Sequence, residues 1–149
     1  MQSLCSGRRD QKHSKHSTAI QCTGLVLRKI FIIDIDGVIC EHVDNEHPEL
    51  MSSAQPYPDS ITKINQWYDQ GHFVCFFTAR TEEHREDTLT WLQNNGVKYH
   101  KLILGKPRRR EGDEYHYIDD TPIRATRYKG VFGDMVKKTK DVMVFEDES

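Results

Sequence analysis

The sequence lacks the features that would assign it to several large classes of protein. Its four cysteines, Cys5, Cys22, Cys40 and Cys75, form no CxxC pair, so neither a disulfide framework nor a structural zinc site is expected. No apolar stretch approaches the ~18–20 residues of a membrane span, and the N-terminus lacks the hydrophobic centre of a secretory signal. We therefore expect a cytoplasmic protein that does not interact with a membrane.

A large excess of positive charge is also absent. The 149 residues carry a formal net charge of −2, which is unevenly spread. Residues 1–29 hold six of the 21 Lys and Arg and one of the 23 Asp and Glu, a net charge of +5, so the remainder carries −7. An acidic body argues against broad binding of nucleic acid.

The chain divides into one domain and two polar ends. Its length suits a single domain with a proper core. Residues 1–28 are rich in Ser, Lys, His, Gln and Thr without periodicity, which predicts a disordered extension rather than an organellar presequence with an amphipathic face. Residues 29–145 form the predicted domain, and residues 146–149 form an acidic tail.

Strand and helix patterns alternate along the domain. Apolar runs predict strands, and capping residues followed by apolar side chains at helical spacing predict helices. Strands separated by single helices favour parallel pairing with right-handed crossovers, and hence an α/β fold with three layers around a central parallel sheet. Strands are predicted at residues 30–33, 72–77, 101–104, 115–118 and 142–145, helices at 59–70 and 81–95, and a further helix start at Thr121 and Pro122.

Two aspartates one residue apart follow the first apolar run. In a parallel sheet, Asp34 and Asp36 emerge at the carboxyl edge, where α/β proteins place their ligand sites. A carboxylate nucleophile such as Asp34 can form an aspartyl-phosphate. Asp36 can protonate the leaving oxygen and later deprotonate water, helped by the turn at Gly37.

Three more polar clusters follow apolar stretches in the same way. Thr78, with backbone N–H groups near it, is predicted to bind phosphoryl oxygens, and Lys106 to neutralise developing charge. Asp34 with Asp119 or Asp120 offers the oxygen ligands that octahedral Mg²⁺ prefers. The residues thus predicted to bind metal are Asp34, Asp119 and Asp120, and the predicted substrate-binding residues are Thr78, Ala79, Arg80 and Lys106.

Two basic features leave alternatives open. Arg80 could bind substrate or pair with Glu82 or Glu83. The run Arg108-Arg109-Arg110 is typical of a solvated charge cluster, but its place after Lys106 makes contact with an anion feasible.

These residues resemble the four motifs of the haloacid dehalogenase superfamily, in that family's order, over roughly residues 29–128. The resemblance implies a Rossmann-like sandwich in which Asp34 is the nucleophile and Asp36 the general acid/base, whose main-chain carbonyl also binds magnesium. It makes Thr78 and Lys106 the second and third motifs and Asp119-Asp120 the fourth. Val38 stands where many members have threonine. The closest resemblance is to phosphatases of polysaccharide biosynthesis.

The spacing of the motifs bears on how the site is covered. The intervals between them leave residues 41–57 as a flap-sized loop, which resembles members without a cap domain. Such members act on large substrates or close the site with a neighbouring subunit. We therefore expect an open site and a homo-oligomer.

The sequence thus predicts a Mg²⁺-dependent phosphatase acting on a sugar phosphate or related metabolite. A polynucleotide end-phosphatase is the alternative enzyme, against which the acidic body weighs. A phospho-receiver signalling module also uses an acceptor aspartate, a hydroxyl, a lysine and an acidic pair. Receivers place the acidic pair first, however, whereas here Asp34 precedes Asp119 and Asp120.

Overall fold

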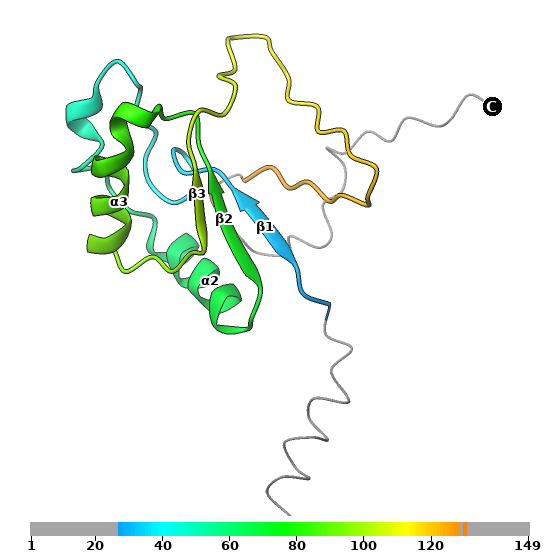
Figure 1. Ribbon diagram of the computed structural model, residues 1–149. Coiled ribbons are helices and arrows are strands. Elements are labelled where there is room, and N and C mark those ends of the chain that lie inside the picture. Colours follow the sequence, from blue (N-terminus) through cyan, green and yellow to red (C-terminus); the bar gives the residue numbers. More distant parts are fainter. Residues whose placement is uncertain (1–26, 129, 131–149) are drawn as a thin grey trace, which may run out of the picture.

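A parallel three-stranded sheet forms the centre of the protein. The computed structural model describes residues 27–128 and residue 130. Strand β1 (Ile30–Ile33), strand β2 (Phe73–Phe77) and strand β3 (Lys101–Ile103) lie in the order β1-β2-β3, with Ile30 opposite Phe73 and Cys75 opposite Lys101. The predicted α/β class with parallel pairing is confirmed, and Figure 1 shows β2 between its two neighbours.

Two helices connect the strands. Helix α2 (Pro58–Asp69) starts with proline at its first turn and Asp59 beside the helix N-terminus, and Gly71 follows it at a positive φ of 90°. The short 3-10 helix η2 (Glu82–His84) leads into helix α3 (Arg85–Asn94). These elements match the helices predicted at residues 59–70 and 81–95 closely.

Both helices pack on the same face of the sheet. Phe31 stacks on Trp67 of α2 with ring centroids 4.0 Å apart, and the indole N–H of Trp91 on α3 donates to the Ala54 carbonyl at 2.9 Å. Among the described residues no helix covers the opposite face, so this part of the chain contains two of the three predicted layers. One core cluster joins the sheet and both helices, and it includes Ile33, Val74, Phe76, Ile64, Trp67, Trp91 and Leu92.

The predicted flap, residues 41–57, packs into the domain rather than standing over it. It contains the 3-10 helix η1 (Pro48–Leu50) and buries Val43, Met51 and Ala54. Backbone hydrogen bonds fix both ends of the segment, from the Glu41 N–H to the Gln55 carbonyl at 2.9 Å and from the Tyr57 N–H to the Ile39 carbonyl at 2.8 Å.

The elements predicted after β3 are not formed in the described residues. Residues 115–118 do not form a strand, and no helix starts at Thr121 and Pro122 within the described residues. Residues 107–127 are all exposed, and Figure 1 shows this segment, from yellow to orange, leaving the sheet after β3. Three predictions lie outside the described residues. They are the tail at residues 1–28, of which only the last two residues are described, the strand at 142–145 and the acidic end.

No helix in the described part of the chain is long and apolar enough to cross a membrane.

Candidate active site

Three of the four predicted polar clusters meet at the carboxyl edge of the sheet. The loops that follow β2 and β3 are joined by backbone hydrogen bonds. The Lys106 N–H donates to the Thr78 carbonyl at 2.9 Å, and the Gly105 N–H donates to the Arg80 carbonyl at 2.8 Å. Because parallel strands end at the same edge, the loop after β1 that carries Asp34 and Asp36 reaches the same place.

Asp34 is oriented by two partners. Its Oδ1 accepts a hydrogen bond from the Ile35 N–H at 2.8 Å, and its Oδ2 lies 3.5 Å from the Lys106 ammonium nitrogen. The side chain keeps 38% of its surface exposed. Burial raises the pKa of Asp34 above its ordinary value, and the nearby charge of Lys106 opposes that rise. The structure therefore presents a fixed carboxylate that a substrate can reach.

Lys106 is enclosed by aromatic rings. Its side chain is only 9% exposed, and its ammonium nitrogen lies 5.8 Å from the ring centroid of Phe77 and 5.0 Å from that of Tyr115. Both distances allow cation–π attraction. The Tyr115 hydroxyl donates in turn to the Pro107 carbonyl at 2.6 Å. These contacts direct the ammonium group toward Asp34.

Arg80 binds neither Glu82 nor Glu83. It is fully buried and holds Asp36 through two hydrogen bonds, from Nη2 to Oδ1 at 2.7 Å and from Nε to Oδ2 at 3.0 Å. Glu82 pairs with Arg85 instead. The structure thus contains neither of the ion pairs inferred for Arg80, because the guanidinium faces the second aspartate of the site. A role of Arg80 in binding substrate stays a prediction.

Thr78 and Ala79 lie at the same edge of the sheet, in the loop that follows β2. Thr78 is fully buried, and its Oγ1 accepts a hydrogen bond from the Arg80 N–H at 3.2 Å. The half-buried Ala79 accepts a hydrogen bond on its carbonyl from the Asn45 side-chain amide at 3.0 Å. The predicted phosphate-binding loop is thus anchored from two directions.

Asp119 and Asp120 lie in the exposed segment and do not join the other clusters. Asp119 Oδ1 accepts hydrogen bonds from both the N–H and the hydroxyl of Thr121 at 3.0 Å, and these bonds lower the pKa of Asp119. No three His, Cys, Asp or Glu side chains of residues 27–128 are placed to hold a metal ion. In this arrangement, the pair Asp119-Asp120 lies apart from Asp34 and Asp36, so the four predicted magnesium ligands are not brought together.

Sequence reasoning missed several residues that shape the site. Thr88, Asn45 and Tyr115 each fix a predicted residue through a tertiary contact, from eight residues away for Thr88 and from 34 for Asn45. Such a contact leaves no local pattern. Only Tyr115 carried a signal, since it starts the apolar stretch before Asp119.

A cavity of about 330 Å³ borders the loop that carries Asp36. Tyr57 and Tyr128 line it and stack with ring centroids 6.4 Å apart, and the Ser60 hydroxyl donates to the Tyr128 hydroxyl at 3.1 Å. Its size falls at the lower end of small-molecule sites. The cavity is lined by Gly37, Tyr57, Pro58, Asp59, Tyr128 and Gly130.

Comparisons with known proteins give one related sequence and similar folds. A Bacillus cereus protein named "Putative nucleotidase" is 34% identical over 74 residues, which is 48% of this chain and 38% of that protein. The chain therefore spans well under half of its relative's length. No family model matches the chain.

Among solved structures, one chain of the Pnkp1/Rnl/Hen1 complex superposes with a TM-score of 0.50 at 20% identity, covering 58% of this chain and 32% of that one. At that identity the likeness shows the α/β fold alone. A class C acid phosphatase from Bacillus anthracis with tungstate bound superposes with a TM-score of 0.48 at 13% identity, covering 67% of this chain and 50% of that one.

Proposed function

We propose that the protein is a phosphohydrolase of the haloacid dehalogenase type that cleaves a phosphate monoester through an aspartyl-phosphate. The observation that carries the proposal is the 3.5 Å approach of the Lys106 ammonium to the Asp34 carboxylate, with Asp36 held two residues further on. A fixed carboxylate beside a shielded cation suits attack on an anionic phosphoryl group. The relative named as a nucleotidase agrees with this class of reaction.

The proposed reaction uses the two aspartates in turn. A carboxylate oxygen of Asp34 attacks phosphorus, the bond from phosphorus to the leaving oxygen breaks, and Asp36 donates its proton to that oxygen. Asp36, now ionised, then takes a proton from water, whose oxygen attacks phosphorus and releases phosphate and Asp34. Lys106 stabilises the negative charge in both steps.

Magnesium dependence is part of the proposal and rests on the sequence pattern. When bound, the ion would reduce the repulsion between the carboxylates and the phosphate. The proposed ligands are Asp34, the Asp36 main-chain carbonyl and the pair Asp119-Asp120, and binding requires the exposed segment to bring that pair to Asp34. Calorimetric titration with Mg²⁺ alone tests this, because the heat of binding seen in the wild type should be lost in Asp34→Asn.

A small phosphorylated metabolite is the substrate class that the site supports best. The cavity beside Gly37 has room for a sugar or nucleoside leaving group, and the net charge of −7 on residues 30–149 repels a polynucleotide. We propose a sugar phosphate or nucleoside monophosphate as substrate, with closure of the open site by a second copy of the chain.

The test is a panel of phosphomonoesters. Release of inorganic phosphate is measured with Mg²⁺ for sugar phosphates, nucleoside monophosphates and a 3′-phosphorylated oligonucleotide, with Asp34→Asn as the inactive control. We expect the highest kcat/KM for a small ester. Hydrolysis of none of these esters by the wild type would reject the proposal.

One observation favours the polynucleotide alternative. Arg108, Arg109 and Arg110 are exposed two to four residues after Lys106, where they could follow a nucleic-acid backbone. A kcat/KM for the oligonucleotide above that of every small ester, together with a monomer in light scattering, would select this alternative.

A further inference from the structure

A buried chain of hydrogen bonds links helix α3 to the acid/base residue of the site. Arg80 has no exposed side-chain surface and Asp36 has 13%. A guanidinium is costly to bury unless its donors are paired. The two bonds to Asp36 use Nε and Nη2, and Nη1 donates to Thr88 Oγ1 at 3.1 Å, so every nitrogen of the guanidinium has a partner.

The direction of each bond in this chain is fixed by chemistry. Thr88 has a single hydroxyl proton, which it donates to the His84 carbonyl at 2.8 Å. Its oxygen is then left to accept from Arg80, and Arg80 in turn can only donate to Asp36. The bonds therefore run outward from Arg80, to Asp36 on one side and through Thr88 of α3 to the His84 carbonyl of η2 on the other.

We propose that Arg80 is a positioning residue that fixes the orientation of the Asp36 carboxylate, and that Thr88 fixes Arg80. The inference rests on the proposed function, in which Asp36 carries the proton. A planar guanidinium that binds both oxygens sets the plane of the carboxylate, which a single hydrogen bond leaves free to rotate. Oδ1 also accepts from the Cys40 thiol at 3.8 Å, so Oδ2 is the oxygen that keeps a second lone-pair direction for the proton that goes to the leaving group.

A purely structural ion pair is the competing explanation. It would stabilise the fold whether or not Asp36 transfers a proton, and its loss would affect every substrate alike. A positioning role instead predicts that the effect disappears once Asp36 cannot act. The two explanations therefore differ in a double-mutant cycle.

The variants are Arg80→Lys, which keeps the charge but loses the planar fork, and Thr88→Val, which keeps the shape but loses the acceptor. Thr88→Ser restores the hydroxyl. Thr90→Val makes the same chemical change at an exposed position of α3. Each is measured alone and with Asp36→Asn, on glycerol 3-phosphate, whose leaving alcohol needs a proton, and on p-nitrophenyl phosphate, whose leaving group hardly does.

For glycerol 3-phosphate we expect Arg80→Lys to lower kcat by about 10²-fold at constant KM, as a misplaced catalytic group does. Thr88→Val should lower kcat by roughly tenfold, because its effect is transmitted through Arg80. Thr88→Ser should recover most of that loss, and Thr90→Val should change nothing. The losses should be smaller on p-nitrophenyl phosphate and absent in the Asp36→Asn background.

The same losses in the Asp36→Asn background would overturn the proposal, as would a rise in KM without a fall in kcat. Equal losses on both substrates in the burst of released alcohol, which reports the acid step alone, would also overturn it. If Arg80→Lys does not fold, the rates of Thr88→Val and Thr88→Ser alone distinguish the positioning role from a structural ion pair. If the wild type hydrolyses no ester, the proposed function fails separately. In that case the unfolding midpoints of Arg80→Lys, Asp36→Asn and the double variant still test the contact, since additive shifts would show that the two residues are not coupled.

Discussion

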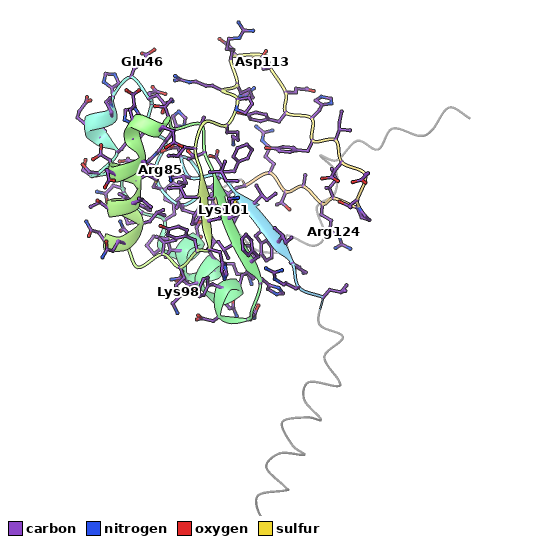
Figure 2. All side chains as sticks on the ribbon, viewed as in Figure 1. Glu46, Arg85, Lys98, Lys101, Asp113 and Arg124 are labelled. Carbon is purple, nitrogen blue, oxygen red and sulfur yellow. The ribbon has the colours of Figure 1, made fainter. Side chains whose placement is uncertain are left out.

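The packed region, residues 30–106, and the exposed segment, residues 107–127, differ in how they are fixed. In the packed region, the loops that carry Asp34, Thr78 and Lys106 bond to one another at the edge of the sheet. The exposed segment has no strand or helix, and Figure 2 places its Asp113 away from the sheet. The predicted polar residues that lie together at the sheet edge are those whose preceding strand is formed in the structure.

This contrast divides the candidate site in two. The proposed nucleophile Asp34, the proposed acid/base Asp36 and Lys106 belong to the packed region. The acidic pair Asp119-Asp120 belongs to the exposed segment. Asp34 belongs to both proposals, whereas Lys106 tests the chemistry alone and the pair Asp119-Asp120 tests the metal binding alone.

The largest expected effect comes from Asp34→Asn. The amide has nearly the same shape but is a poor nucleophile, so phosphate release should fall below detection while the unfolding midpoint stays close to that of the wild type. Rates near those of the wild type would remove Asp34 from the mechanism.

Asp119→Asn and Asp120→Asn apply the same change to the exposed segment. If the pair binds magnesium, at least one variant should lose activity and need more Mg²⁺ for half-maximal rate, with no change in stability because both side chains are exposed. Full activity of both variants at every Mg²⁺ concentration would show that the site works without this pair.

Lys106→Met tests the cation of the packed region. The methionine keeps much of the length between the rings of Phe77 and Tyr115 but removes the charge, so kcat should fall by about 10²–10³-fold, as for the loss of one group that stabilises the transition state. Lys101→Met, an exposed lysine at the start of β3 (Figure 2), is the matched control and should keep the wild-type rate. A similar loss in both variants would indicate an effect of net charge rather than of position.

The packed region was largely predictable from the sequence because its signals are local. Apolar runs and helix starts gave β1, β2, β3, α2 and α3 to within a few residues, and parallel pairing then brought Asp34 and Lys106 to one edge. The partners of Arg80 were not predictable, because Asp36 and Thr88 reach it through tertiary packing rather than through spacing along the chain.

The exposed segment could not be predicted in the same way. Tyr115, Tyr117 and Ile118 have the composition of a strand, yet a strand also needs a neighbour that supplies hydrogen bonds. In the structure, Tyr115 contacts Lys106 and Tyr117 instead, and Ile118 is 88% exposed. A local apolar pattern does not distinguish a strand from an exposed segment whose aromatic side chains contact nearby residues.

A pair of truncations compares the energetics of the two regions. Leu92→Ala removes a fully buried side chain of α3 and should lower the free energy of unfolding by about 2–5 kcal/mol. Ile118→Ala removes an exposed one and should change it by no more than ~0.5 kcal/mol. Urea denaturation of both variants measures the difference. A large loss of stability in Ile118→Ala would mean that this side chain packs in solution.

The smallest expected effect is the reactivity of Cys40. Burial, together with the nearby Asp36 carboxylate, raises the pKa of the Cys40 thiol to about 12. The reactive species is the thiolate, so at pH 8 only about one thiol in 10⁴ is ionised, and burial also blocks access. We expect no alkylation of Cys40 by iodoacetamide in the native protein and rapid alkylation in urea, followed by peptide mapping.

Arg80→Lys provides the sharper comparison, because a loosened Asp36 would open the space around Cys40, whose sulfur lies 3.8 Å from Asp36 Oδ1. Alkylation that is faster in this variant than in Thr90→Val would indicate that the buried chain from α3 also keeps the loop after β1 closed, whereas equal rates would confine its effect to the orientation of Asp36.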